Sequence, residues 1–383
     1  MENNSPSLLR ALLVRWAEIN SGSGNPAGLD AMRAALASEF ATLPGASVTH
    51  LPLQSTTAQA LRVQVRPAAP RQILLSGHYD TVFGPEHAFQ TCTQLDADTL
   101  RGPGVTDMKG GLVTMLAALR EFEGGPLANQ LGYEILLTPD EETGSLATRA
   151  LIEQAARAGF ALGLVFEPAR GNGDIVRKRK GTGCYTIACH GRAAHAGRDP
   201  KAGRNAILAL GEFLRRADEL NGRQEGLTLN VGNIRGGGPV NIVPDFAIAQ
   251  VDARIARVAH VGFIEEQLGE IADAINAREG YRVEVSGGFN RPPKEISPVE
   301  EKLFHAWQAC AAQLGLTVGW QDVGGGSDGN LLAAAGLPVL DGLGPVGDHV
   351  HSPNEFIMLP TLAGRAAVTA RFLTKFAAAE IAV

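Results

Sequence analysis

Apolar residues recur along the chain with two different periods, and these periods predict its helices and strands. Spacings of three and four residues indicate amphipathic helices, whereas short apolar or alternating runs indicate strands. The helical spacing predicts helices over 6–19, 30–42, 110–122, 145–158, 203–218, 261–275, 299–315 and 359–379. The other pattern predicts strands over 73–76, 132–138, 161–166, 184–191, 228–234, 246–254, 281–287 and 337–340.

The order of these elements predicts two domains in the 383 residues. Strands alternate with helices up to residue 173, which is typical of an α/β layer with a largely parallel sheet. Residues 174–289 follow the order β-α-β-β-α-β, the split unit of a ferredoxin-like α+β domain. We therefore predict an α/β domain formed by 1–173 and 290–383, with the α+β domain inserted into it.

Composition narrows the class of protein. A net charge of −6 argues against nucleic acid as a partner, because phosphate binding requires a basic face. No uninterrupted apolar run reaches the roughly 18 residues of a membrane span, and residues 1–20 lack the pattern of a signal peptide. We therefore expect a cytoplasmic location. No C-x-x-C pair indicates a zinc knuckle or a redox motif, and four cysteines in a chain of this size favour free thiols over a disulfide framework. The cysteines are Cys92, Cys184, Cys189 and Cys310.

Acidic and histidine residues follow the predicted strands of the α/β domain. Singly, a strand-end aspartate is usually a turn residue and paired glutamates are usually solvated. Their shared position at carboxyl ends of strands, where open α/β sheets bind ligands, favours one site. Mixed imidazole and carboxylate ligands suit Zn²⁺, with Co²⁺ or Mn²⁺ as alternatives. The residues are His78 and Asp80 in G-H-Y-D, Asp107 in G-P-G-V-T-D-M-K-G-G, Glu141 and Glu142 after E-I-L-L-T, and Glu167 after L-G-L-V-F.

Four of these segments resemble the signature blocks of the M20 metallopeptidase family. They are G-H-Y-D-T-V, G-P-G-V-T-D-M-K-G-G, D-E-E-T-G and H-S-P-N-E, and the resemblance extends over essentially the whole chain. The family includes glutamate carboxypeptidases, succinyl-diaminopimelate desuccinylases, acetylornithine deacetylases and aminoacylases. The resemblance implies a zinc-exopeptidase-like catalytic domain carrying an inserted lid domain that also forms a homodimer.

The resemblance also implies a site for two Zn²⁺ ions per chain. Asp107 corresponds to the carboxylate that bridges both metals. His78 and Glu167 complete one metal site, and Glu142 and His351 complete the other. In relatives the peptide bond after the bridging aspartate is cis, so we expect a cis bond between residues 107 and 108.

The chemistry implied by the family needs two further carboxylates. Two metals share a water molecule and lower its pKa toward about 7. Glu141 resembles the general base that takes the proton of this water and passes it to the leaving amine. Asp80 resembles the carboxylate that fixes the tautomer of the ligating His78.

The segment G-D-H-V-H-S-P-N-E offers two histidines for one ligand position. The family pattern places the ligand immediately before Ser-Pro or Thr-Pro, which selects His351 over His349. Alternate residues of an extended segment point to opposite sides, so we expect only one of the two at the metals.

The inserted domain contributes the candidate substrate contacts. His195 in G-R-A-A-H-A-G resembles the histidine that steadies the oxyanion, often in the partner subunit's site. Asn241 and Arg254 resemble residues that meet the substrate, and a bidentate arginine–carboxylate pair would select a free carboxylate. Arg291 and Lys180 are weaker candidates, and each of these basic residues is otherwise a surface residue. For the homodimer, strands 184–191 and 228–234 are candidate sheet edges that could pair, and packing of the helices at 203–218 about a two-fold axis is the alternative.

We predict an M20-type metallo-exopeptidase that cleaves a peptide or amide bond beside a free carboxylate, closest to glutamate carboxypeptidases. The substrate is a small peptide or an N-acyl amino acid. The alternative is an N-acyl-amino-acid amidohydrolase of the acetylornithine deacetylase or succinyl-diaminopimelate desuccinylase type, which shares the metal chemistry. A non-catalytic binding protein on this scaffold is disfavoured because all five ligands and the base are present. A metal-independent serine hydrolase is disfavoured because the match to its G-x-S-x-G pattern, G-G-S-D-G at residues 325–329, lies in a loop that resembles a substrate-cleft loop of the M20 family.

Overall fold

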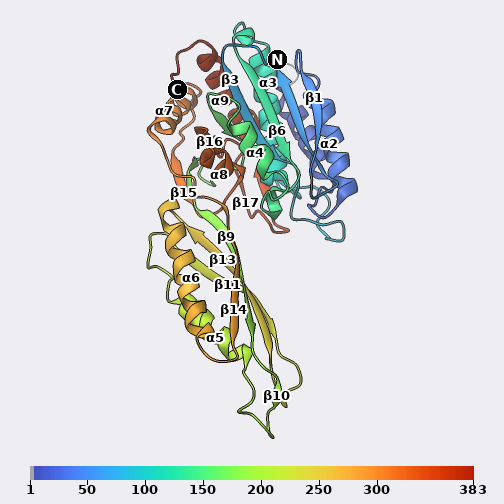
Figure 1. The fold of residues 1–383 in the computed structure, drawn as a ribbon. Coiled ribbons are helices and arrows are strands. Elements are labelled where there is room, and N and C mark those ends of the chain that lie inside the picture. The colour runs from blue at the N-terminus through green and yellow to red at the C-terminus, as the bar shows by residue number, and fades with distance from the viewer. Residues whose placement is uncertain (1–3) are drawn as a thin grey trace. The chain divides into compact units, whose positions relative to one another are not determined.

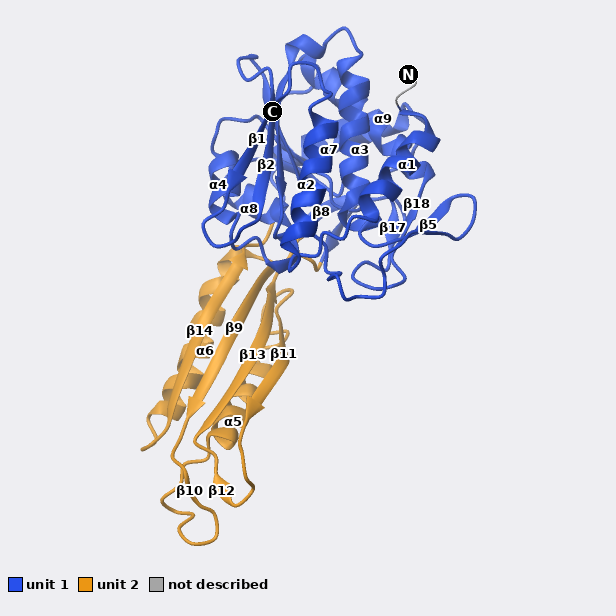
Figure 2. Cartoon of the chain, turned by 90° about the vertical axis from the view of Figure 1, so that its right-hand side faces the viewer, with its two compact units in different colours: residues 1–178, 296–323, 327–383 blue, residues 179–295, 324–326 orange. Residues whose placement is uncertain are grey.

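The computed structural model describes residues 4–383, which form two compact units (Figure 2). Of the described residues, the first unit comprises 4–178, 296–323 and 327–383, and the second comprises 179–295 together with 324–326. The chain passes from the first unit to the second after residue 178, later than the boundary at 173 predicted from the sequence. The reason is that Val176 still pairs with Asp341 in the large sheet of the first unit. The three residues 324–326 belong to the second unit although their chain neighbours belong to the first.

An eight-stranded sheet forms the middle of the first unit (Figure 1). Its strands lie in the order β1-β2-β6-β3-β7-β16-β8-β15. The four strands from β6 to β16 are parallel. The pairs β1–β2, β2–β6 and β16–β8 are antiparallel. The sheet is therefore mixed, whereas the sequence predicted a largely parallel sheet. The bounds are β1 (Ser47–Pro52), β2 (Gln59–Val65), β3 (Gln72–His78), β6 (Gly132–Thr138), β7 (Gly163–Val165), β8 (Ile175–Arg179), β15 (Trp320–Val323) and β16 (Val339–Asp341).

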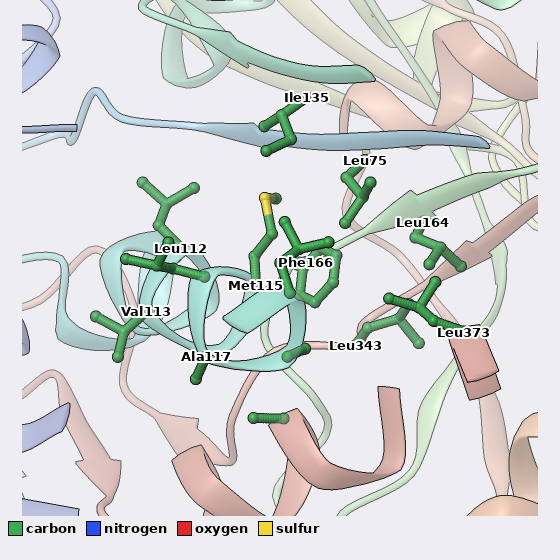
Figure 3. Close-up of a cluster of buried hydrophobic side chains, with 14 of the residues drawn as sticks. Leu75, Leu112, Val113, Met115, Ala117, Ile135, Leu164, Phe166, Leu343 and Leu373 are labelled. Atoms are coloured by element: carbon green, nitrogen blue, oxygen red, sulfur yellow. The ribbon is translucent and has the colours of Figure 1, made fainter. Parts of the chain in front are cut away.

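Helices cover both faces of this sheet, and the alternation of strand residues decides which face each side chain meets. Leu75 of β3 and Ile135 of β6 pack toward α3, as does Leu164 (Figure 3). Leu74 precedes Leu75 and Leu136 follows Ile135, and both join the core under α4 and α8. The helices are α1 (Pro6–Ala17), α2 (Pro26–Phe40), α3 (Gly110–Glu123), α4 (Arg149–Ala156), α7 (Pro298–Ala312), α8 (Asp328–Ala334) and α9 (Pro360–Ala377), with the short turn η3 (Ala128–Gln130).

A small antiparallel sheet in the first unit brings two distant segments together. Its order is β17-β18-β5-β4, and Phe356 lies opposite Arg101 in the register. The loop that follows β5 therefore lies against the loop that precedes β18. The bounds are β4 (Thr93–Gln94), β5 (Thr99–Arg101), β17 (Gly347–Asp348) and β18 (Phe356–Met358).

The second unit has the β-α-β-β-α-β order expected from the sequence. Its antiparallel sheet runs β11-β13-β9-β14, and both helices pack against it, which is the ferredoxin-like arrangement. Strand β9 lies between β13 and β14, so the expectation that residues 184–191 form an edge is wrong; β11 is an edge. The bounds are β9 (Gly181–His190), β10 (Ala194–His195), α5 (Ala206–Asp218), β11 (Thr228–Gly236), β12 (Ile242–Val243), β13 (Phe246–Ile255), η5 (Val258–His260), α6 (Val261–Asn276) and β14 (Arg282–Arg291).

Among residues 4–383, no helix is both long enough and apolar enough to cross a bilayer.

Candidate active site

Three neighbouring parallel strands deliver four of the candidate residues to one edge of the large sheet. His78 is the last residue of β3, which lies between β6 and β7. Glu141 and Glu142 open the turn η4 (Glu141–Thr143) just beyond β6, and Glu167 lies two residues beyond β7. Because these strands are parallel, their carboxyl ends meet at the same edge, as the sequence analysis assumed.

Asp107 reaches this edge from the turn η2 (Val105–Lys109), which precedes α3. The Asp107–Met108 peptide bond is cis, so this expectation from the family resemblance is confirmed. One carboxylate oxygen, Oδ1, lies 3.1 Å from Nε2 of His78, and the other, Oδ2, lies 3.3 Å from Nε2 of His351. A single carboxylate thus lies between two imidazoles.

The five candidate ligands form two groups that share Asp107. In one group His78 lies with Asp107 and Glu167; in the other Asp107 lies with Glu142 and His351. Within each group the ligand atoms lie within 4.8 Å of one another. Imidazole nitrogens and carboxylate oxygens in two such triads fit a pair of divalent cations, with Asp107 able to offer one oxygen to each.

The charges in the site favour bound cations. Burial opposes ionisation of Asp107, but the hydrogen bonds from His351 and His78 hold its pKa well below the ordinary value. The hydrogen bonds to Asp107 and Glu142 raise the pKa of His351 to about 11. Burial and the neighbouring charge of Asp107 raise the pKa of Glu142. Each imidazole therefore holds a proton tightly where a metal ion would otherwise bind.

Asp80 connects His78 to the turn that carries both glutamates. Its Oδ1 lies 3.2 Å from Nδ1 of His78, which leaves Nε2 directed at Asp107. The backbone N–H groups of Glu141 and Glu142 donate to Oδ1 and Oδ2 of Asp80, each at 3.1 Å. Ser23 adds a hydroxyl bond to Oδ2 at 2.7 Å. The fully buried Asp80 thereby fixes the imidazole and the Glu141–Glu142 backbone together.

His351, and not His349, lies with the other ligand candidates. The geometry therefore agrees with the choice of His351 that the Ser-Pro pattern implied. The expectation that the segment around the two histidines is extended is wrong. Both histidines have positive φ, 57° at His349 and 61° at His351, so they lie in a tight turn. The ring of His349 instead contacts that of Phe356, with ring centroids 5.8 Å apart.

The candidate substrate residues all lie in the second unit, where the structure places them in two pairs. Residues 194–195 of β10 pair with 242–243 of β12, and the Ala196 N–H donates to the Asn241 carbonyl at 2.9 Å, so His195 and Asn241 are neighbours. The backbone N–H groups of Gly197 and Arg198 donate to Nδ1 of His195, at 3.1 and 3.2 Å. Because Nδ1 accepts these bonds, the neutral His195 ring carries its proton on Nε2, where it can donate a hydrogen bond to another group.

Arg254 and Arg291 form the second pair. They lie on either side of Thr182, which is opposite Arg254 in β13 and opposite Arg291 in β14. Arg254 donates through Nε and Nη2 to Asp252, and through Nη1 to the Gly324 carbonyl at 2.9 Å. Arg291 is buried, and Lys180 is a half-buried residue between β8 and β9.

The two pairs lie at opposite ends of the same sheet. Thr182 is near the start of β9 and His190 at its end, and β10 begins beyond that end. Eight residues of strand at about 3.3 Å each span roughly 26 Å. Within one second unit, His195 and Arg254 are thus too far apart to contact one small substrate.

Comparison with known proteins establishes the family. The sequence profile of Peptidase family M20/M25/M40 matches residues 74–375. The chain belongs to the M20 peptidase family. The match covers most of the first unit and the whole of residues 179–295, and it includes every candidate ligand.

Similar M20 proteins include peptidases and amidohydrolases. Carboxypeptidase G2 of Pseudomonas sp. (strain RS-16) is 26% identical over 383 residues, covering 99% of this chain and 91% of that protein. Succinyl-diaminopimelate desuccinylase of Acidovorax ebreus (strain TPSY) is 28% identical over 329 residues, covering 82% and 81%. Among solved structures, a Staphylococcus aureus tripeptidase superposes with TM-score 0.82 at 22% identity over 98% and 99% of the two chains. The Bacillus subtilis YXEP protein, described as a dinuclear metal binding M20 peptidase, superposes with TM-score 0.68 at 13% identity over 98% of each.

Two buried residues beside this site were not predicted from the sequence. Glu355 accepts three backbone N–H bonds from the Asp107 loop, and burial raises its pKa to about 7. Lys109 donates to the Ile19 carbonyl at 2.8 Å, and burial lowers its pKa to about 7. Their one sequence signal is their place inside the quoted blocks, because their partners are remote in the chain.

Proposed function

We propose that this M20 chain is a dinuclear metal hydrolase that cleaves a peptide or amide bond next to a free carboxylate, as a glutamate carboxypeptidase does. The observation that carries the proposal is the position of Asp107 between His78 and His351, each backed by one further glutamate. We assign the two triads to two Zn²⁺ ions, for which Co²⁺ or Mn²⁺ can substitute. The similarity to carboxypeptidase G2 over almost the whole chain supports this branch of the family.

The proposed reaction assigns a separate role to each of several residues of the chain. Bound metal ions supply an acidified water molecule and polarise the scissile carbonyl. Glu141 accepts the proton of the attacking water and returns it to the leaving amine. Oδ1 of Asp80 accepts the Glu141 N–H and lies beside Nδ1 of His78, so Asp80 keeps the Glu141 turn and the His78 ring at a fixed separation. His195 donates from Nε2 to the oxyanion, and Asn241 beside it contacts the substrate.

Arg254 is the proposed anchor for the free carboxylate of the substrate. A guanidinium has five N–H donors. Three donors of Arg254 are directed at Asp252 and Gly324, which leaves one N–H on Nη1 and one on Nη2. Two N–H groups on the terminal nitrogens suit a bidentate carboxylate contact, and Asp252 holds the fork in place. Arg291, in register on the other side of Thr182, is a second cation for this end of the sheet.

The active form is proposed to be a homodimer joined through the second unit. One chain cannot apply both His195 and Arg254 to one substrate, because they lie at opposite ends of its sheet. A partner chain that supplies His195 resolves this. Apolar side chains on the edge strand β11 and the adjoining helix α5 are exposed, which suits an interface. They are Ile207, Leu208, Val231 and Ile234.

A substrate panel tests the reaction. The purified protein is loaded with Zn²⁺, Co²⁺ or Mn²⁺ and assayed on N-acyl glutamates, folyl glutamates and dipeptides, each with a free or an amidated terminal carboxylate. We expect turnover of the free acids and loss of turnover on amidation, with KM raised in Arg254→Ala. Equal rates on amidated substrates would contradict the carboxylate requirement.

The second candidate is an N-acyl-amino-acid amidohydrolase. It is favoured by the 28% identity to a desuccinylase over 82% of the chain. N-succinyl and N-acetyl derivatives of diamino acids therefore belong in the same panel. Faster turnover of these compounds than of the glutamate conjugates would select this candidate.

A further inference from the structure

Glu355 is a buried carboxylate that belongs to the loop after His351 but binds the loop of Asp107. Its Oε1 accepts the backbone N–H groups of Thr106 and Asp107, at 2.8 and 3.0 Å. Its Oε2 accepts the N–H of Gly104 at 3.1 Å. Its own backbone carbonyl accepts the N–H of Gly102 at 3.1 Å. Four hydrogen bonds thus join one residue to a segment some 250 positions earlier in the chain.

Neither loop holds its shape by regular secondary structure. The His351 turn contains two non-glycine residues with positive φ, His349 and His351, a conformation that L-residues rarely adopt. In the other loop Asp107 has φ −114° and ψ 98°, which is not helical although helix α3 follows directly. Backbone in such conformations persists where surrounding contacts fix it, and Glu355 supplies contacts to both loops.

We propose that Glu355 is the positioning residue that sets the separation of Asp107 and His351. These two residues are ligand candidates of the same triad, with Asp107 Oδ2 3.3 Å from His351 Nε2. The Glu355 carboxylate accepts the backbone N–H of Asp107 directly. Glu355 also lies four residues after His351, and its own N–H donates to the Ser352 carbonyl at 3.1 Å, which stabilises the turn that follows His351. Replacing it therefore affects the Asp107–Glu142–His351 triad most, and the His78 triad only through the shared Asp107.

The chain offers a matched control for this inference. Glu300 is another buried glutamate of the first unit whose two oxygens accept backbone N–H groups, from Val339 at 3.1 Å and Ser297 at 2.8 Å. It caps α7 and belongs to neither ligand triad. Loss of Glu300 or of Glu355 removes a buried acceptor of comparable kind, so both should lower the melting temperature of the metal-free protein.

The test is a Co²⁺ titration of the metal-free full chain, followed by absorbance, for the wild type, Glu355→Gln, Glu355→Ala, Glu300→Gln and Glu300→Ala. We expect one of the two Co²⁺ affinities to fall about 10–100-fold in Glu355→Ala, the usual loss when an outer partner of metal ligands is removed. Glu355→Gln should lie between wild type and Glu355→Ala, since its one amide oxygen still accepts from Thr106 and Asp107. Both Glu300 variants should keep two wild-type affinities.

Each outcome decides a separate question. Unchanged affinities in folded Glu355 variants, or equal losses in the Glu300 variants, would overturn the positioning role. If Glu355→Ala does not fold, the comparison of Glu355→Gln with Glu300→Gln carries the test under the same criteria. The inference rests on the proposed dinuclear site, so a wild-type chain that fails to bind two Co²⁺ would overturn the proposed function and the inference together.

Discussion

The carboxylate of Asp80 accepts a hydrogen bond from the backbone N–H of Glu141 at 3.1 Å, and the same oxygen lies 3.2 Å from Nδ1 of His78. The residue expected to orient one ligand therefore also fixes the turn of the proposed general base. We predict that Asp80→Asn weakens metal binding about 10–100-fold and also lowers kcat. An amide has one accepting atom, so one of the two N–H groups of residues 141 and 142 loses its partner.

The Asp80 prediction is checked by metal titration and by steady-state kinetics at saturating metal. Asp322→Asn, which alters an exposed ion pair with Arg177, is the matched control and should change neither quantity. A variant whose kcat recovers fully at saturating metal would show that Asp80 acts on His78 alone.

Glu141→Gln should separate metal binding from turnover. Glu141 is in neither ligand triad, so the variant is expected to keep two metal ions per chain. Its kcat should fall by about two to four orders of magnitude, the usual contribution of general acid–base catalysis. Metal content by mass spectrometry and kcat on the best substrate of the panel are the measurements. The exposed Glu121→Gln serves as control, and near-normal turnover in Glu141→Gln would exclude the base role.

Metal binding should release protons and strengthen as pH rises. The pKa of His351 in the metal-free fold is raised from 6.5 to about 11, so this imidazole is protonated at neutral pH and must lose its proton to bind a metal. Each released proton makes the affinity rise about tenfold per pH unit. Calorimetric titrations in buffers of different ionisation enthalpy count these protons, and His351→Ala should release one fewer.

The same raised pKa predicts how the stability of the metal-free protein depends on pH. The protonated His351 stabilises the fold fully below pH 6.5, and this contribution is lost as the pH rises toward about 11. The melting temperature of the metal-free wild type should therefore fall more steeply with pH above 6.5 than that of His351→Ala. Identical pH profiles would contradict the assignment.

The sequence predicted the first-unit ligand group because its signals are local. His78, Glu141, Glu142 and Glu167 follow short apolar runs, and parallel strands gather such positions at one edge. Strand β1 was missed because residues 47–52 are mostly exposed and carry no apolar run. Strand β2 was missed although its buried Leu61, Val63 and Val65 alternate with polar residues. The second role of Asp80 and the role of Glu355 could not be predicted, because hydrogen bonds from remote backbone leave no pattern in the sequence.

Ile234→Asp should dissociate the proposed dimer. Ile234 lies on the edge strand β11 with 56% of its surface exposed, and a buried charge at an apolar interface is costly. Sedimentation should show monomers for this variant and dimers for the wild type. Val258→Asp is the control, since Val258 is similarly exposed at 51% but lies in the turn η5, beyond the end of β13 that pairs with Thr228 and not with Ile234. A dimeric Ile234→Asp variant would place the interface elsewhere.

Mixing experiments test whether His195 acts on the partner's site. Protomers carrying Glu141→Ala and protomers carrying His195→Ala should each be inactive alone. After subunit exchange, one site of each hybrid has an intact Glu141 and an intact His195, so activity should return. Absence of recovery with exchange confirmed by mass would exclude the shared arrangement.

The second unit is discontinuous in the sequence, because it includes the triglycine segment 324–326 as well as residues 179–295. Arg254 bonds the carbonyl of Gly324, and Arg179 bonds that of Gly325 at 3.3 Å, so two arginines depend on peptide groups encoded beyond residue 295. A fragment limited to residues 179–295 lacks both carbonyls. Grafting the second unit between M20 relatives, to transfer substrate preference, therefore requires moving this glycine segment with it.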